Sequence, residues 1–200
     1  TTNIHPKWHP SGRSYAYLSN KGNDYFGQTS LYFHDITTGE DKKVKSGVFS
    51  APTWHPNGEL IYYSRKPKFP NKNGSKFYDI YSYDLESEEE QRLTFDLRAF
   101  NPVFIEHDSS IAYLATYDGG QDIYMFDLRS KSSKKITDFK DRPMISHLSY
   151  DKDQKKLYFD ITKNHYRDIY SIDIKNENID QHYDSPTYDE RNLTAQSGGK

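Results

Sequence analysis

The chain has 200 residues, of which 34% are hydrophobic, and a net charge of -2 from 27 basic and 29 acidic residues. This balance gives no global positive field, which excludes broad binding to nucleic acid or to an anionic membrane surface, and the absence of cysteine excludes disulfides and thiolate sites. Aromatic residues nevertheless make up 16% of the chain, whereas disordered segments are poor in rings, so we expect a folded protein with many small aromatic contacts.

The apolar segments and the first residues give two further expectations. No stretch approaches the roughly 18 apolar residues of a membrane span, and the first residues do not resemble a signal peptide. We therefore expect a chain that does not span a membrane. The missing initiator Met indicates a processed or trimmed polypeptide.

Four copies of one unit follow each other along the chain. Each copy has an aromatic anchor, and seven and nine residues after it stand two apolar or aromatic residues. A fixed period of this length indicates a repeat architecture. The anchors are Trp8, Trp54, Phe104 and Tyr150, separated by 46, 50 and 46 residues.

A second landmark in each copy is the pattern Leu/Ile-Tyr-x-x-Asp. An aspartate that recurs at a strand end is expected to accept backbone N–H hydrogen bonds in the following turn. We therefore assign it a structural role rather than a catalytic one. The four aspartates are Asp35, Asp84, Asp127 and Asp173.

Within each copy, short runs rich in Tyr, Phe, Ile, Leu and Val are separated by Gly, Pro, Asn, Asp and Ser, which is typical of antiparallel strands. Repeats of about this length built from four strands indicate an all-β fold, a β-propeller of four-stranded antiparallel blades. The four repeats cover residues 3–48, 49–97, 98–141 and 142–194, and 195–200 form a tail.

The end of the fourth repeat can be aligned in two ways. Residues 189–194 echo 90–94 and are expected to form its fourth strand, after an insertion at about 175–188. Alternatively, residues 186–188 are the anchor of a fifth unit.

The second repeat carries a resemblance to a known family. Residues 52–58 (PTWHPNG), followed by 61–64 (IYYS), 79–85 (DIYSYDL) and 92–94 (RLT), resemble the repeat of TolB-type propellers, and 115–122 resemble the second turn of that family. The family's usual Ser-Asp-Gly after the anchor is replaced here by His-Pro-Asn-Gly or His-Pro-Ser-Gly.

This resemblance implies a larger assembly, a setting and a function. TolB-like propellers usually close with six blades, so four repeats imply part of a larger propeller that associates with further blades or another chain. The family's setting implies a periplasmic or otherwise extracytoplasmic protein of the bacterial envelope. The function of the family implies that this chain is a non-catalytic scaffold whose rim and channel mouth bind a protein or peptide partner.

The long second turn of the second repeat is the first candidate binding segment. It is rich in basic residues and contains a phenylalanine that looks exposed, which favours contact with an acidic partner or a neighbouring domain. A solvated hairpin tip is the alternative. The acidic segment 86–90 is expected on the opposite rim as a solvated turn. The candidate contact residues are Arg65, Lys66, Lys68 and Phe69.

The residues that lead into the innermost strands are the second candidate. Arg98 and Arg142 stand just before these strands in successive repeats, with Phe100 close behind Arg98. Two guanidinium groups at one channel mouth could hold a carboxylate bidentately. We predict that these three residues bind the partner, and a coincidence of the periodic architecture is the alternative.

The sequence contains no recognisable catalytic, cofactor or metal motif. Its histidines lack a metal-ligand spacing such as HExxH, and neither a GxSxG nucleophile elbow nor a phosphate loop is found. We therefore predict no enzyme activity, no catalytic residue, no cofactor and no metal. Two alternatives remain open. One is the gating propeller of a prolyl-oligopeptidase-like hydrolase, and the other is a polysaccharide lyase that would hold a divalent ion near His5 and His147.

Overall fold

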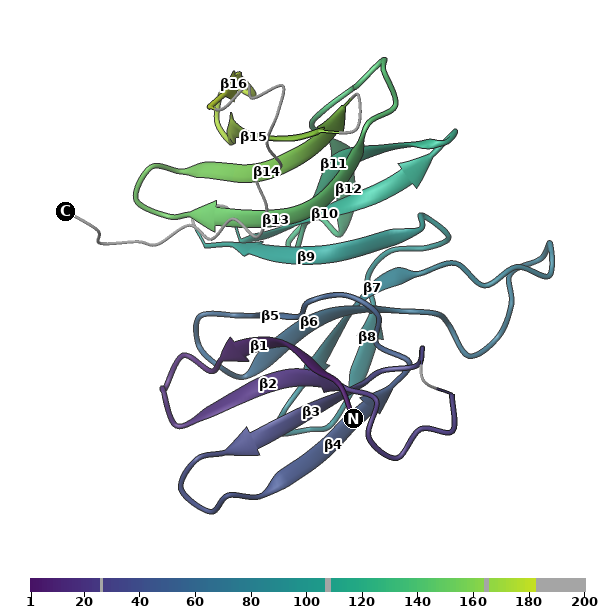
Figure 1. Ribbon diagram of the computed structural model, residues 1–200, viewed down its shortest axis with the longest axis vertical. Helices are drawn as coiled ribbons and strands as arrows, with labels where there is room; N and C mark the ends of the chain where they lie inside the picture. Colours follow the sequence, from purple (N-terminus) through teal and green to yellow (C-terminus); the bar gives the residue numbers. More distant parts are fainter. Residues whose placement is uncertain (26, 107–108, 164–165, 183–200) are drawn as a thin grey trace. The chain divides into compact units, whose positions relative to one another are not determined.

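The computed structural model describes residues 1–25, 27–106, 109–163 and 166–182, and these ranges contain strands, turns and no helix (Figure 1). The strands are β1 (Asn3–Trp8), β2 (Ser14–Ser19), β3 (Ser30–Asp35), β4 (Asp41–Ser46), β5 (Thr53–Trp54), β6 (Leu60–Arg65), β7 (Asp79–Asp84), β8 (Glu90–Arg92), β9 (Ala99–Ile105), β10 (Ser110–Tyr117), β11 (Gly120–Asp127), β12 (Ser132–Lys135), β13 (Met144–Asp151), β14 (Lys156–Lys163), β15 (Tyr166–Asp173) and β16 (Ile179–Gln181).

These strands form four sheets of four strands each. The sheets consist of β1 to β4, β5 to β8, β9 to β12 and β13 to β16, and strands that are neighbours in a sheet are also neighbours in sequence. Each anchor lies in the first strand of its sheet. The four-stranded blade that the sequence predicts is therefore present four times.

The four landmark aspartates have the structural role predicted for them. In every sheet the Oδ1 atom of this aspartate accepts the backbone N–H groups of the residues two and three positions later, at distances between 2.7 and 3.1 Å. A side chain that satisfies two turn N–H groups ends the third strand and starts the turn to the fourth.

The fourth strand of the last sheet differs from the sequence prediction. The structure places β16 at Ile179–Gln181, inside the segment 175–188 that the sequence analysis treats as an insertion, and residues 189–194 lie outside the described residues. The prediction was wrong because the turn at Asp173 is as short as in the other repeats, so the fourth strand follows it directly.

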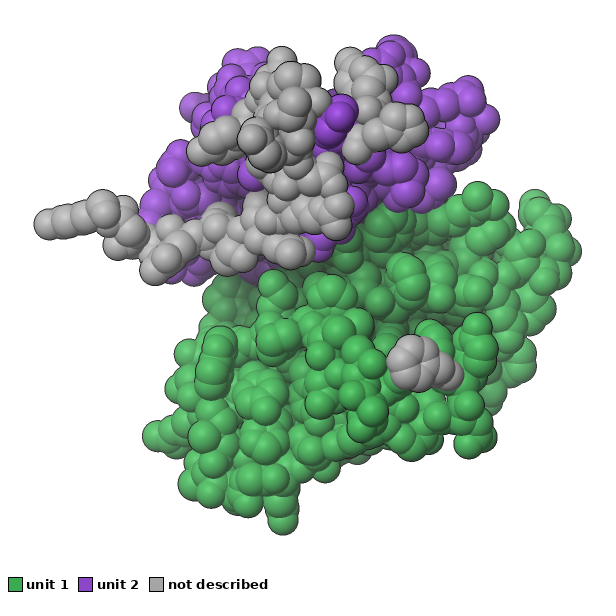
Figure 2. Space-filling view, viewed as in Figure 1, with its two compact units in different colours: residues 1–102 green, residues 103–200 purple. Residues whose placement is uncertain are grey.

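The chain divides into two compact units, residues 1–102 and 103–200, with the boundary inside β9 (Figure 2). In unit 1, one apolar cluster joins the first two sheets. Ala16 and Leu18 from β2 belong to it together with residues of β5, β6 and β7. The second sheet contributes Trp54, Ile61, Tyr63, Tyr81 and Tyr83. In unit 2, the central strands bury Ile111, Tyr113, Ile123, Leu157 and Phe159.

Candidate functional site

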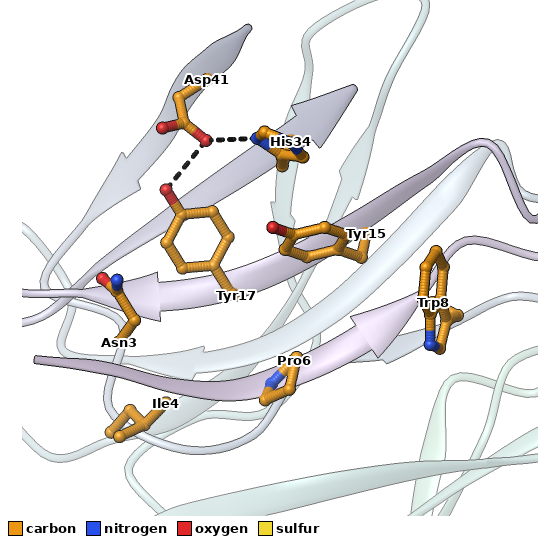
Figure 3. Close-up of a pocket in the computed structure, with 8 residues that line it drawn as sticks. All are labelled: Asn3, Ile4, Pro6, Trp8, Tyr15, Tyr17, His34 and Asp41. Carbon is orange, nitrogen blue, oxygen red and sulfur yellow. Dashed lines mark hydrogen bonds and ion pairs between the residues drawn. The ribbon is translucent and has the colours of Figure 1, made fainter. Parts of the chain in front are cut away.

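A cavity of about 550 Å³ lies on one face of the first sheet, within unit 1. Figure 3 shows aromatic and polar side chains from β1, β2, β3 and β4 around it. The lining residues are Asn3, Ile4, Pro6, Trp8, Tyr15, Tyr17, His34 and Asp41.

The alternation of side chains along β2 creates this face. Tyr15 and Tyr17 point to the cavity, whereas Ala16 and Leu18 between and beside them point to the apolar cluster with the second sheet. The register pairs Tyr15 with His34. An aromatic face and an apolar face thus lie on opposite sides of the same sheet.

The polar part of the cavity is centred on Asp41. Its carboxylate accepts a hydrogen bond from the Tyr17 hydroxyl at 2.9 Å, and His34 Nδ1 lies 3.0 Å from Oδ1 (Figure 3). Lys21 Nζ donates to the other carboxylate oxygen at 2.6 Å. The hydrogen bond from Lys21 lowers the pKa of Asp41 to about 2. Burial raises the pKa of Tyr17. A carboxyl group with a lowered pKa cannot act as a general acid near neutral pH, so this cluster is an ion-pair network.

The second sheet has the same tyrosine–carboxylate pair at the same repeat positions, but its cation comes from a different position. Tyr63 donates to Glu90, and Glu90 also binds Arg65, whose Nε lies 2.8 Å from Oε1. The Arg65 guanidinium stands 4.8 Å from the centre of the Tyr81 ring. In the second sheet this face is covered by the first sheet, because Tyr63 and Tyr81 belong to the shared cluster.

This comparison within one unit explains the cavity. Trp8 and Trp54 occupy equivalent positions, yet Trp8 is 64% exposed and Trp54 only 8%. The cavity face is therefore built like a face that packs against a neighbouring sheet, and its tyrosine–carboxylate pair recurs on the packed face of the second sheet.

The structure gives Arg65 and Glu90 roles that the sequence analysis missed. Arg65 forms a two-pronged ion pair with Glu90 in the interior of unit 1, and both side chains are mostly buried. Although burial opposes it, the hydrogen bond from Arg65 lowers the pKa of Glu90. The expectation of a solvated turn at 86–90 is therefore wrong for Glu90, because its strand lies beside β7 and reaches Arg65 across it.

The other predicted residues of the second-repeat turn are exposed. The connection from β6 to β7 extends beyond its sheet (Figure 1). Lys66 Nζ stands 5.0 Å from the centre of the Tyr78 ring, and Lys68 Nζ stands 5.3 Å from that of Phe69. Phe69 is 71% exposed.

Arg98 and Arg142 have the same backbone conformation in different units. Both residues adopt the left-handed backbone conformation, with φ of 52° and 51°, and each precedes the innermost strand of its sheet. The Arg98 guanidinium stands 4.5 Å from the centre of the Phe77 ring, whereas Arg142 forms an ion pair with Asp118 at 2.6 Å. Their joint binding of one carboxylate stays a prediction, as does the role of the half-buried Phe100.

Aromatic partners of these cations complete a surface that the sequence analysis did not identify. The Phe49 and Tyr78 ring centres are 4.6 Å apart, and Lys66 lies over Tyr78. We name this surface the aromatic–basic rim and define it by Phe49, Lys66, Phe77, Tyr78 and Arg98. Its members come from the β4–β5, β6–β7 and β8–β9 connections of unit 1.

The loop that carries Arg98 is fixed by the buried carboxylate of Asp79. This carboxylate accepts the N–H groups of Asp96 and Leu97 at 3.1 and 3.2 Å and the Thr94 hydroxyl at 2.9 Å. Arg92 adds an ion pair at 2.6 Å. The backbone that presents Arg98 is therefore held by several bonds to one side chain.

The described part of the chain contains neither a metal-binding cluster nor a membrane-spanning helix. Within it, no group of three or more His, Cys, Asp or Glu side chains could hold a metal ion. In the same ranges, no helix is long and apolar enough to cross a membrane.

Comparisons with known proteins agree on the fold. The family model of the dipeptidyl peptidase IV (DPP IV) N-terminal region matches residues 87–197. The chain is 35% identical over 97 residues to the Tol-Pal system protein TolB of Ruthia magnifica subsp. Calyptogena magnifica, which covers 46% of this chain and 20% of that protein. The chain thus spans about a fifth of the length of this relative.

Solved structures give the same result. TolB from Acinetobacter baumannii superimposes with a TM-score of 0.70 at 20% identity, over 90% of this chain and 43% of that one. A puromycin-hydrolyzing peptidase from Mycobacterium tuberculosis reaches a TM-score of 0.70 at 14% identity, over 93% of this chain and 30% of that one. The predicted β-propeller fold and the resemblance to TolB-type propellers are confirmed.

Proposed function

The chain belongs to the family of the dipeptidyl peptidase IV N-terminal region, and from this membership and its TolB-like fold we propose that it is a non-catalytic binding module. It presents loops at the rim of its blades to a protein or peptide partner. A shared fold does not fix a function, so the proposal depends on the surface of this chain.

The aromatic–basic rim is the observation that carries the proposal. Phe49 in the β4–β5 connection is 53% exposed, and Phe69 in the β6–β7 connection is 71% exposed. Exposed rings next to arginine are typical of surfaces that bind proteins, because Tyr, Phe and Arg are enriched at interfaces. The loops of one rim thus combine apolar contact area with charge.

The predicted contact residues divide into two groups on this basis. Arg65 is engaged with Glu90 and stabilises the sheet, so we propose that it supports the hairpin without touching the partner. Lys66, Lys68, Phe69 and Arg98 are accessible and are proposed to make contact. Phe100 and Arg142 are also proposed to contact the partner, because of their positions in the repeat.

The setting is proposed by family likeness. The relative from Ruthia magnifica is a Tol-Pal system protein, which supports a periplasmic or otherwise extracytoplasmic location at the bacterial envelope. We also propose that the four repeats are part of a larger propeller of about six blades, because the chain covers 43% of the TolB structure from Acinetobacter baumannii.

Site-specific photo-crosslinking in the cells that naturally produce the protein tests the binding function. Benzoylphenylalanine is placed at Phe69 or at Phe100, and at the exposed Lys43 of β4 as a matched control. A defined protein adduct, identified by mass spectrometry, is expected from Phe69 or Phe100 and not from the control. The absence of adducts at both of these positions, or equal adducts at the control, would contradict the proposal.

A second candidate function is the propeller portion of a peptidase, which the family match at residues 87–197 favours. In that case the product of the complete gene would hydrolyse chromogenic peptide amides and react with a fluorophosphonate probe for serine hydrolases. The binding-module proposal expects neither reaction.

A further inference from the structure

We propose that the aromatic–basic rim is the docking surface for an acidic segment of a protein partner, whose carboxylates pair with Lys66 and Arg98. This inference rests on the proposed binding function and adds the chemistry of the partner. Figure 1 allows the reader to follow the three connections of unit 1 that contribute to the rim.

Hydrogen bonds tie the three connections to β6 and to one another. The Phe49 N–H donates to the Ser64 carbonyl at 2.9 Å, which ties the β4–β5 connection to the end of β6. The Ala99 N–H donates to the Tyr78 carbonyl at 2.7 Å, and the Ser64 hydroxyl donates to the Ala99 carbonyl at 2.8 Å. The rim is therefore organised before a partner arrives, which reduces the entropy lost on binding.

The hairpin beyond the rim is also closed by its own bonds. The Asn71 N–H donates to the Ser75 carbonyl at 2.8 Å, and Asn71 Oδ1 accepts the N–H groups of Asn73 and Ser75 at 3.0 Å. Lys76 Nζ donates to the Lys68 carbonyl at 2.7 Å. This turn holds Lys68 and its neighbour Phe69 on a defined loop.

The charge of this surface is positive and is not neutralised locally. The β6–β7 connection, residues 66–78, contains four lysines and no acidic residue. Within the described ranges, Lys66 and Arg98 form no ion pair and stand over rings instead, unlike Arg65, which is paired with Glu90. A cation that rests on an aromatic face keeps N–H donors free, so an arriving carboxylate can bind it.

The arrangement of the aromatic rings favours an acidic polypeptide over nucleic acid or an anionic bilayer as the partner. Arg98 covers one face of Phe77 and Lys66 covers one face of Tyr78, so these two faces are not available as platforms for stacked bases. The whole chain has a net charge of -2, which gives no broad field for nucleic acid or an anionic bilayer. The exposed Phe49 instead supplies apolar contact beside the charges.

Fluorescence anisotropy with defined probes tests this assignment. The probes are a short fluorescein-labelled peptide of glutamate and phenylalanine and the same peptide with glutamine in place of glutamate. The acidic peptide is expected to bind the full chain about tenfold more tightly, with an affinity that falls as salt rises. The double variant Lys66→Glu/Arg98→Glu should lose about tenfold, whereas Lys43→Glu, an exposed lysine of β4, should change binding less than about twofold. Circular dichroism confirms that both variants are folded.

Three results would overturn the inference: equal binding of the two peptides, unchanged binding by the double variant, or tighter binding of a single-stranded oligonucleotide or of phosphatidylserine vesicles. The experiments distinguish failure of this acidic-partner inference from failure of the proposed binding function. Specific adducts at Phe69 or Phe100 together with no preference for the acidic peptide would refute the acidic partner and leave the binding module standing.

Discussion

The two tryptophans occupy equivalent repeat positions, but their removal is expected to have very different effects on stability. Trp54 is 8% exposed; its ring centre lies 5.2 Å from that of Phe33 and 4.8 Å from that of His9, and its Nε1 donates to the Lys7 carbonyl at 3.0 Å. Trp8 is 64% exposed. Trp54→Ala therefore opens a cavity between two sheets, whereas Trp8→Ala removes a ring that is mostly in water.

The magnitudes follow from the buried area. Burying about 200 Å² of aromatic side chain at about 25 cal/mol/Å² is worth about 5 kcal/mol as an upper limit, and measured Trp→Ala changes in cores cost about 3–5 kcal/mol. We expect Trp54→Ala to lower the free energy of unfolding by about 4 kcal/mol. Trp8 is 64% exposed and so buries only about a third of its side chain, and Trp8→Ala should therefore cost about 1.5 kcal/mol.

Urea unfolding followed by far-ultraviolet circular dichroism measures both values, and an unchanged slope against urea shows that the unfolded states are comparable. The reasoning would be refuted if the two variants lost the same free energy within about 1 kcal/mol. That result would mean that the cavity face of the first sheet is covered in solution and that its tryptophan is part of a core.

Two further substitutions test the ion pairs. Glu90→Gln leaves the mostly buried Arg65 without its anion and should lower the free energy of unfolding, measured in urea, by about 2–3 kcal/mol. The control Glu89→Gln changes an exposed side chain and should alter this free energy by less than about 0.5 kcal/mol. Equal losses in the two variants would contradict the assigned pair. Because Lys21 lowers the pKa of Asp41 to about 2, the carboxylate stabilises the fold above about pH 4, and this contribution is lost as the pH falls through about 2. Because the pair is accessible, the free energy of unfolding of Asp41→Asn should differ from that of the wild type by under about 1 kcal/mol. This difference should shrink as the pH falls from about 4 to about 2, and a constant difference would refute the ion pair.

Most strand positions could be predicted because they depend on local signals. The anchors, the alternation that follows them and the turn aspartates lie within one hairpin each, so the sequence alone indicates them. The last strand could not be found in this way. The ninth residue after Asp173 is His182, where the other repeats have Val, Leu or Ile. His182 still donates its N–H to the Ile169 carbonyl at 2.9 Å, as Leu93 and Ile136 do to their counterparts of Ile169, so the backbone pattern persists without the apolar landmark.

Among the site residues, too, some could be predicted from the local sequence and others could not. Lys66 could be identified as exposed because it lies in a run of Lys, Pro, Asn and Gly between strands. Its aromatic partner could not, because Phe49 and Tyr78 meet only through the packing of two connections. The role of Arg65 was missed for a related reason, since its partner Glu90 lies two strands away and its position depends on the register of β8.

Stacked ring pairs explain how a chain with 34% hydrophobic residues fills its interior. Each sheet has such a pair on its second and third strands, at the same two repeat positions, with ring centres 5.6 to 6.3 Å apart. Rings bury a large area per residue, so few residues suffice. The pairs are Tyr17–Tyr32, Tyr63–Tyr81, Tyr113–Tyr124 and Phe159–Tyr170.

The first ring of each pair is matched to the residue at one position of the fourth strand. A buried phenol needs a hydrogen-bond acceptor, and in three sheets this position supplies one. The pairs are Tyr17 with Asp41, Tyr63 with Glu90, and Tyr113 with Ser133. In the fourth sheet the ring is Phe159, which has no hydroxyl, and the equivalent position holds Ile179. The polar residue at this position of the fourth strand therefore satisfies a buried ring hydroxyl of its own blade, which is why Glu90, at the end of the acidic segment 86–90, is engaged by the sheet.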